Sequence, residues 1–196
     1  MLRKLTDKDF KVMPWKNGKG TTTELYRIDV GSEMAFRVST AKVEHSGPFS
    51  DFSGYDRTLV NLGPSNMQLA IDGQDARTLA ALEHIHFDGG AKAHCEVRSP
   101  CDDLNFFCRK EQFFASTIVR RLKKPEFIPL LANSGWFLFV VSGRLCAHGP
   151  QGRETLLGPR EVLIQDLGGA TGQDRLMLAS ASEDVCVLIA VSFRQS

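Results

Sequence analysis

The chain has 196 residues, of which 42% are hydrophobic and 24% charged, and its 24 basic and 23 acidic side chains nearly cancel. Such a chain forms one large or two small globular domains, and its near-neutral charge gives no reason to expect a nucleic acid partner. Apolar runs such as Trp136 to Val141 are far shorter than the roughly 20 residues that cross a bilayer, and residues 1–10 carry scattered charges unlike a signal peptide. We therefore expect a cytoplasmic protein that contacts neither nucleic acid nor a membrane.

The first predicted element surrounds "MPWKNGKGTTTELY", Met13 to Tyr26. Its glycines, Gly18 and Gly20, are too close together for a phosphate-binding loop, which needs Gly-x4-Gly-Lys-Ser/Thr between a strand and a helix. The following "TTTELY" favours a strand over a helix. We interpret the run as two strands joined by a tight turn at Asn17 and Gly18.

Short strand-like segments follow along the rest of the chain. They are rich in branched and aromatic residues and bounded by Gly, Pro, Asp or Ser, and no long stretch has helical spacing. The segments are residues 36–43, 57–62, 66–71, 84–88, 136–141, 160–166 and 184–193. Many short strands separated by turns predict an all-β sandwich or barrel.

The two halves of the chain resemble each other. "LVNLG" (residues 59–63) aligns with "FVVSG" (139–143), and "HIHFD" (84–88) aligns with "VLIQD" (162–166). In each half a strand ends at a glycine, a hairpin follows, and a second strand ends at an aspartate, which is the plan of a cupin barrel. We predict two RmlC-like double-stranded β-helix barrels fused in tandem, a bicupin, with domains 1–112 and 113–196 packed as one compact unit.

Five cysteines at irregular spacing, without a Cys-x-x-Cys pair, predict buried free thiols in a reducing compartment.

A metal centre is not favoured by the sequence. Metal-binding cupins carry a pattern resembling His-x-His-x3-Glu-x6-Gly, and its alignment on Gly63 puts Ser50 and Phe52 at the two histidine positions. Asp56 takes the carboxylate position, and the later histidine position falls at Lys92. A rival cluster is open to metal analysis, and it consists of His84, His86, His94, Cys95 and Cys101. We predict no metal and no cofactor.

Three stretches resemble the HutD/Ves family of bacterial proteins. They are "PWKNGKGTTTELY" (residues 14–26), "FRVSTAKVEHSGPFSDFSGYDRTLVNLG" (36–63) and "DDLNFFCRK" (102–110). The resemblance implies a two-barrel cupin outside the metal-dependent enzymes of that superfamily. It also implies an association with histidine utilisation, in which binding of formylglutamate or a related catabolite has been suggested, and a link to stress responses.

The family-like polar residues form the candidate ligand site. Arginine guanidinium groups can hold a carboxylate in two parallel hydrogen bonds, and an asparagine can bind an amide. Alternatively, the arginines pair with Glu24, Asp56 and Asp103 and only brace the barrel. The predicted ligand-binding residues are Lys16, Asn17, Thr23, Glu24, Arg37, Ser39, Arg57, Asn105 and Arg109. Pro14 and Trp15 are expected to shape the turn.

The leading hypothesis is a non-catalytic, metal-independent cupin that binds a small anionic metabolite and regulates a catabolic pathway. Two enzyme alternatives stay open: a metal-free isomerase or epimerase, and a metal-dependent cupin using His84, His86 and His94. The first needs a general acid/base such as Glu24 with a perturbed pKa. Edge strands also leave a homodimer open.

Overall fold

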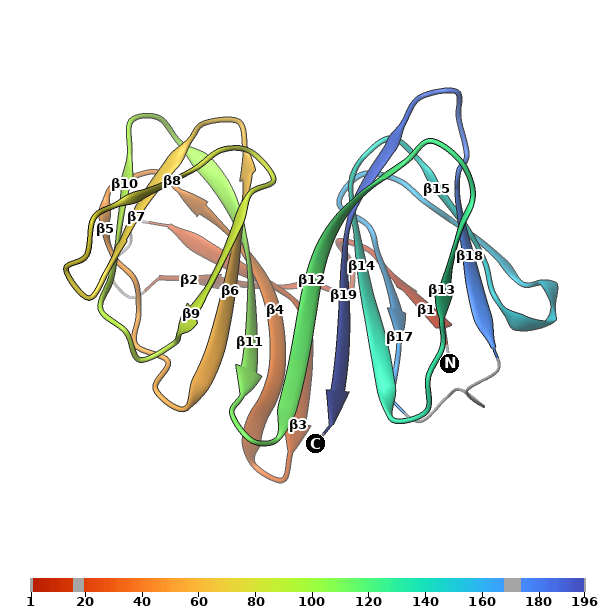
Figure 1. Ribbon diagram of the computed structural model, residues 1–196, viewed down its shortest axis with the longest axis horizontal. Coiled ribbons are helices and arrows are strands. Elements are labelled where there is room, and N and C mark those ends of the chain that lie inside the picture. Colours follow the sequence, from red (N-terminus) through yellow and green to blue (C-terminus); the bar gives the residue numbers. More distant parts are fainter. Residues whose placement is uncertain (1, 16–19, 168–173, 196) are drawn as a thin grey trace. The chain divides into compact units, whose positions relative to one another are not determined.

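The computed structural model describes residues 2–15, 20–167 and 174–195, which form two β units (Figure 1). The N-terminal unit is residues 10–112, and the C-terminal unit is residues 1–9 together with 113–196. Within the described residues the only helical segment is the 3-10 turn Pro150–Gly152. No helix there is long and apolar enough to span a membrane. The predicted all-β class is confirmed.

Two antiparallel sheets make up the N-terminal unit. The strand order is β2-β3-β4-β11-β6-β9 in one sheet and β5-β10-β7-β8 in the other. The strands are β2 (Lys11–Pro14), β3 (Thr21–Val30), β4 (Glu33–Val43), β5 (Gly47–Pro48), β6 (Tyr55–Gly63), β7 (Met67–Ile71), β8 (Arg77–Leu79), β9 (His84–Asp88), β10 (Ala93–Val97) and β11 (Cys101–Arg109).

The C-terminal unit also has two antiparallel sheets, ordered β1-β17-β14-β19-β12 and β13-β18-β15-β16. Its strands are β1 (Leu2–Leu5), β12 (Phe113–Leu122), β13 (Glu126–Pro129), β14 (Ser134–Ser142), β15 (Leu145–His148), β16 (Glu154–Leu157), β17 (Val162–Gln165), β18 (Arg175–Ser180) and β19 (Cys186–Gln195). The sequence-based boundaries put residues 1–9 in the first barrel, but β1 forms its ladder with β17, Leu5 opposite Val162.

Each unit buries apolar side chains from both of its sheets in one core. In the N-terminal unit, Leu59 of β6 packs in the same cluster as Leu69 of β7. In the C-terminal unit, Leu138 of β14 packs with Leu178 of β18. Because side chains alternate between faces, every second residue of a strand reaches the core. The sheets of the structure are not closed into barrels, although the architecture is cupin-like.

The internal repeat predicted from the sequence is confirmed by the strand order. The series β4-β11-β6-β9 has the same connectivity as β12-β19-β14-β17, and β5-β10-β7-β8 matches β13-β18-β15-β16. The ladders, however, align Leu59 with Leu138. Both ladders have a bulge, opposite Asp102 and Asp103 in β6 and opposite Val187 and Leu188 in β14, and matching the two bulges pairs Leu59 with Leu138. The sequence alignment on the glycines had paired Leu59 with Phe139. An offset of one residue moves a side chain to the other face of the sheet. The ladder alignment therefore pairs residues that lie on the same face in the two units.

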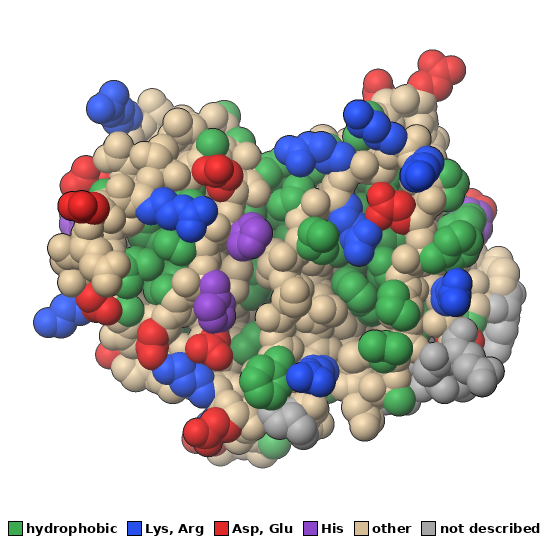
Figure 2. Space-filling model, in the orientation of Figure 1, with side chains coloured by type: hydrophobic (Ala, Val, Ile, Leu, Met, Phe, Trp, Pro, Cys, Tyr) green, Lys and Arg blue, Asp and Glu red, His purple; other side chains and the backbone are tan. Residues whose placement is uncertain are grey.

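All five cysteines are free and buried, as predicted. Over the face drawn in Figure 2, basic and acidic side chains lie interspersed. That distribution agrees with the nearly balanced composition.

Candidate functional site

A cavity of about 520 Å³ lies in the N-terminal unit, against the six-stranded sheet. Pockets of roughly 300–1,000 Å³ are typical of small-molecule sites. The lining residues are Pro14, Trp15, Thr22, Arg37, Ser39, Ala41, Pro48, Phe49, Ser50, Phe52, Arg57, Asp103, Asn105 and Phe107. The wall therefore combines two arginines and a carboxyl group with four aromatic side chains.

Strand alternation explains why the polar groups meet in this cavity. Residues 37, 39 and 41 of β4 and residues 103, 105 and 107 of β11 occupy one face of their strands. The ladder register places Asn105 opposite Ser39, and Phe107 opposite both Arg37 and Arg57. Three adjacent strands thus present their polar side chains to the same space.

Arg57, Asn105 and Asp103 form a buried hydrogen-bonded chain. Arg57 donates from Nε and Nη2 to Oδ1 of Asn105, at 3.0 and 2.6 Å. Asn105 in turn donates from Nδ2 to Oδ1 of Asp103 at 2.7 Å, and that oxygen also accepts the backbone N–H of Ala41 at 3.1 Å. All three side chains are buried. Asn105 therefore positions the guanidinium group, and its carbonyl oxygen is already occupied by Arg57.

The guanidinium of Arg57 is held between aromatic rings. Its central carbon lies 4.3 Å from the ring centroid of Phe49, 5.2 Å from that of Phe107 and 5.3 Å from that of Phe87. Burial lowers the pKa of Arg57 to about 10, so the side chain stays cationic at neutral pH. Within the described residues, Nη1 has no hydrogen-bond acceptor. The edge formed by Nη1 and Nη2 is therefore available to a ligand.

Asp103 titrates far above an ordinary aspartate. Burial raises the pKa of its carboxyl group from 3.8 to about 6, and the nearby Arg57 charge opposes that shift. Asn105 and the Ala41 N–H, both hydrogen-bonded to Asp103, also oppose it. The cavity consequently contains one carboxyl group that changes charge close to neutral pH.

The second arginine, Arg37, is less buried than Arg57. Its Nε donates to Oε2 of Glu24 at 2.8 Å, and its side chain is 12% exposed. Its guanidinium lies 5.8 Å from the ring centroid of Phe107, which itself packs on Phe52 with centroids 4.2 Å apart. Among the described residues, Glu24 is the only acceptor for Arg37, which leaves both Nη groups available.

Trp15 forms another part of the wall. Its indole Nε1 donates to the hydroxyl of Thr22 at 2.8 Å, and its backbone N–H donates to the carbonyl of Gly20 at 2.9 Å. A Cβ at position 20 would lie 3.0 Å from two carbon atoms of the indole, so glycine allows this close approach. The sequence interpretation gave Trp15 and Pro14 a turn-shaping role, yet both residues line the cavity.

The structure brings only some of the predicted site residues together. Arg37, Ser39, Arg57 and Asn105 line the cavity together. Glu24 is not in the wall but forms an ion pair with Arg37, which is. Thr23 is not in the wall either, although its neighbour Thr22 lines the cavity. Arg109 lies further along β11 and pairs with Glu33. Lys16 and Asn17 lie outside the described residues.

Sequence reasoning missed most of the aromatic wall. Phe49, Phe52 and Phe107 come from two segments distant in the sequence, and no local pattern connects them. One signal was present, because the histidine positions of the metal-cupin pattern fall on Ser50 and Phe52, and both line the cavity. Asp103 was considered as a pairing partner of the arginines, and the sequence did not indicate its complete burial in the cavity wall.

The histidine cluster considered as a metal site does not come together. His84 and His86 are exposed on β9 and His94 is exposed on β10, in the other sheet. His86 hydrogen-bonds through Nδ1 with the hydroxyl of Thr58 at 3.0 Å. Among the described residues, the one group of three possible metal ligands is elsewhere, in the C-terminal unit.

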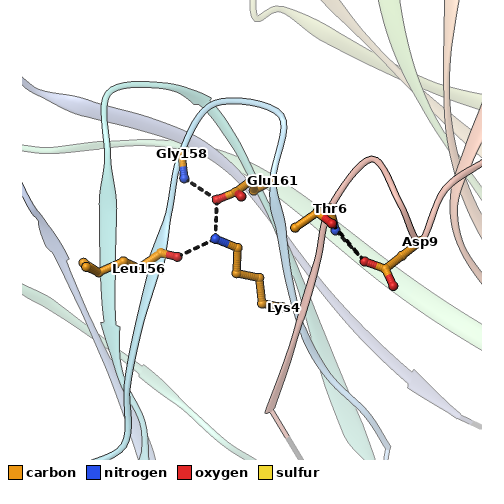
Figure 3. A network of polar contacts seen from close by, with 6 residues as sticks. All are labelled: Lys4, Thr6, Asp9, Leu156, Gly158 and Glu161. Atoms are coloured by element: carbon orange, nitrogen blue, oxygen red, sulfur yellow. Dashed lines mark hydrogen bonds and ion pairs between the residues drawn. The ribbon is translucent and has the colours of Figure 1, made fainter.

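A second cavity, of about 750 Å³, lies in the C-terminal unit between β1 and the residues that follow β16. Two of its charged residues, Lys4 and Glu161, are paired with each other (Figure 3). Lys4 forms an ion pair with Glu161 at 2.6 Å and donates to the carbonyl of Leu156 at 2.9 Å. Glu161 also accepts the N–H of Gly158 at 2.6 Å. This network fastens β1 to β16 and the segment that follows it.

Comparisons with known proteins agree with this architecture. A family model described as HutD matches residues 7–183. An uncharacterized 21.2 kDa protein in the hutC 3' region of Pseudomonas putida is 38% identical over 99 residues, 49% of this chain and 52% of that protein, about half its length. Protein Ves of Citrobacter koseri is 28% identical over 143 residues, 69% of this chain and 72% of that protein.

Solved structures extend the likeness to the whole fold. HutD from Pseudomonas fluorescens SBW25, in a formate condition, has a TM-score of 0.83 at 27% identity, with both chains covered completely. A cupin 2 conserved barrel domain protein from Leptotrichia buccalis has a TM-score of 0.60 at 8% identity, covering 94% of this chain and 92% of that chain. The second likeness concerns the fold alone.

Proposed function

The chain belongs to the HutD family of the cupin superfamily, and we propose that it binds a small anionic metabolite in the cavity of the N-terminal unit without a metal. The ligand class is a small carboxylate such as formylglutamate or a related catabolite of histidine. Binding serves a regulatory role in histidine utilisation or a stress response rather than turnover of the ligand.

The observation that carries this proposal is the state of Arg57. A guanidinium costs free energy to bury, and here it is buried with a neutral asparagine as its only hydrogen-bond acceptor among the described residues. Asp103 is one residue further along the hydrogen-bonded chain, so its charge favours the cationic form of Arg57 from the far side of Asn105. A ligand carboxylate on the Nη1–Nη2 edge would compensate the charge with two parallel bonds.

The rest of the wall suits a ligand with one charged and one less polar end. Arg37 offers a second cationic group on β4, which β11 separates from the β6 strand of Arg57, and Ser39 offers a hydroxyl on the same face of β4. Phe49 and Phe52 cover the aliphatic part of a ligand. Because the Asn105 carbonyl is occupied by Arg57, the earlier hypothesis that Asn105 binds a formamide group is replaced by a positioning role.

Binding is measured by isothermal titration of the full chain with N-formylglutamate, glutamate and formate, with and without a chelator. A ligand that binds the native state also raises the melting temperature in a concentration-dependent way. Arg57→Met should weaken binding by at least roughly thirtyfold, because truncating a buried charge partner costs about 2 kcal/mol or more. The matched control is Arg77→Met, at an exposed arginine of β8 outside the cavity.

Two outcomes would reject the site: no binding of any of the three anions, or equal affinity of Arg57→Met and the wild type. Arg37→Gln repeats the test at a more exposed position in case Arg57→Met does not fold. Affinity for the anion should also rise as pH falls through about 6, because the carboxylate of Asp103 then loses its negative charge.

A metal-free isomerase or epimerase is the second candidate, and Asp103 is the observation that favours it. A carboxyl group in the cavity wall with a pKa of about 6 has the value expected of a general acid/base. Incubation with L-glutamate or N-formyl-L-glutamate in deuterated water tests this, because proton abstraction would replace the Cα hydrogen with deuterium. Binding without exchange would support the non-catalytic role.

A further inference from the structure

Three potential metal ligands meet on the C-terminal unit, at a position that the ligand cavity does not involve. Cys146 and His148 alternate onto one face of β15, and Glu154 lies directly opposite His148 on β16. The neighbouring residues Leu145 and Ala147 point into the apolar core, so the three ligands lie on the outer face of the sheet. We propose that Cys146, His148 and Glu154 form a binding site for a divalent metal ion of the zinc type.

The distances fit a single ion. One donor atom from each residue lies within 4.8 Å of those of the other two. Sγ of Cys146 is 3.1 Å from Nε2 of His148, and Nδ1 of His148 is 3.8 Å from Oε2 of Glu154. An ion would bind only one of these two ring nitrogens, and the 4.8 Å limit already holds with a single donor atom from each residue. In a tetrahedral zinc site the sulfur and nitrogen ligands are about 3.5 Å apart, so a separation of a few tenths of an ångström would admit the ion.

Burial and strand pairing give the site a rigid base and an open side. Cys146 is only 9% exposed, while the side chains of His148 and Glu154 are 35% and 53% exposed. β15 is hydrogen-bonded on both sides, to β16 and β18, which fixes the two ligands that it carries. Three protein ligands with an exposed fourth position leave room for water or an exchangeable ligand.

The donor set selects the class of metal. A thiolate and an imidazole favour zinc, cobalt or copper over magnesium or calcium, which prefer oxygen ligands. The pair Cys146–His148 is separated by one residue, a spacing that serves as two ligands only on a strand, and this is why motif searches for Cys-x-x-Cys pass over it. The other two His-containing strands of the chain lack this arrangement within the described residues.

Titration of the metal-free full chain with Co²⁺ tests the site, in the presence of a non-thiol reductant. Binding should produce a thiolate-to-cobalt charge-transfer absorption that saturates at one ion per chain. Cys146→Ser should abolish that absorption. His148→Ala should weaken zinc affinity at least about tenfold, measured by competition with a chromophoric chelator.

Two matched controls isolate the site. Cys186→Ala removes another buried thiol of the same unit, and His86→Ala removes an exposed histidine elsewhere. Both should bind Co²⁺ as the wild type does. The proposal is overturned if the wild type shows no thiolate absorption, or if the absorption persists in Cys146→Ser. Because His148 is partly exposed, His148→Ala provides the test in a folded protein even if Cys146→Ser is unstable.

Discussion

The N-terminal and C-terminal units share a strand order but differ in what their equivalent strands present to the interior. In the N-terminal unit, β11 contributes Asp103 and Asn105 to the cavity. The ladders place Leu188 and Ala190 of β19 at the equivalent positions, and both belong to the apolar core of the C-terminal unit. One sheet framework therefore supports a polar cavity in one unit and a filled core in the other.

The same contrast appears at Arg57. The alignment that pairs Leu59 with Leu138 also pairs Arg57 with Trp136 of β14. Arg57 lies opposite Phe107 of β11, and Trp136 lies opposite Ser192 of β19. Trp136 packs against the C-terminal core and donates its indole N–H to the carbonyl of Pro129 at 2.9 Å. The shared fold thus does not determine where the polar cavity lies. Substitutions that exchange residues between equivalent positions test which side chains each interior accepts without unfolding.

The largest effect is expected when a carboxyl group is placed in the C-terminal core. Leu188→Asp reproduces the residue of the N-terminal cavity at a fully buried position without a cationic or hydrogen-bonding partner in its apolar cluster. The free energy of unfolding should fall by more than about 5 kcal/mol, enough to unfold the unit. Urea unfolding followed by circular dichroism measures it.

Leu188→Met is the control for Leu188→Asp, because a volume-conserving apolar exchange should cost less than about 1.5 kcal/mol. Similar stabilities of the two variants would mean that water reaches this position and that the C-terminal unit has a hidden polar interior. The proposed contrast between the units would then be lost.

A change in the opposite direction should be costly in the N-terminal unit. Asn105→Leu makes position 105 aliphatic, like Ala190, but removes the acceptor of Arg57 and the donor to Asp103. The expected loss is about 3–4 kcal/mol of unfolding free energy, because a buried charge is left without its partner. Ser50→Ala, in the same wall, should change stability by less than about 0.5 kcal/mol. Equal effects in the two variants would show that the hydrogen-bonded chain is not structural.

The third effect is a pH dependence of the free energy of unfolding. Asp103 can ionise, whereas its equivalent in the C-terminal unit, Leu188, cannot. The pKa of Asp103 is raised from 3.8 to about 6 in the folded protein, so between these values the folded state binds more protons than the unfolded state. The contribution of Asp103 to the free energy of unfolding is therefore fully present below about pH 4 and is lost as the pH rises through about 6. A shift of this size corresponds to up to about 3 kcal/mol.

Asp103→Asn should remove this dependence, because an amide keeps the oxygen that accepts from Asn105 and Ala41 but cannot ionise. Unfolding free energies of the variant and the wild type, measured from pH 4 to pH 7, should diverge in favour of the variant as pH rises. Parallel curves would mean that Asp103 has an ordinary pKa and that the interior is more hydrated than its burial indicates.

The sequence predicted the fold well because its signals were local. Residues 84–88 were predicted as a strand and are β9, and residues 57–62 lie within β6. The pairing of β1 with β17 was not foreseen, because four residues with two charges carry little strand signal and their partners are about 160 residues away. Local patterns specify strands, but long-range ladders depend on the whole core.

The site was predictable to the extent that alternation decides it. Arg37 and Ser39 are two residues apart in a predicted strand, so alternation puts them on one face, and both line the cavity. Thr23 was taken from the family motif, whereas alternation would have chosen Thr22, which lies opposite Ala41 of the wall. The aromatic cover of Phe49 and Phe52 comes from the segment around β5, whose packing no periodicity reveals.

The smallest effect concerns Trp15. It follows β2, and β2 and β3 lie beyond the series of strands that the two units share. Gly20→Ala places a Cβ 3.0 Å from the indole and should displace the ring, because so short a contact cannot persist. The stability loss should be below about 1 kcal/mol, since the indole is only partly buried and can move outward.

Anion affinity should fall a few-fold if Trp15 covers the bound ligand. Gly47→Ala, where an added Cβ meets nothing within 4 Å, is the control. Unchanged affinity in Gly20→Ala would exclude Trp15 from the ligand contact and limit the site to the three strands that carry Arg37, Arg57 and Asn105.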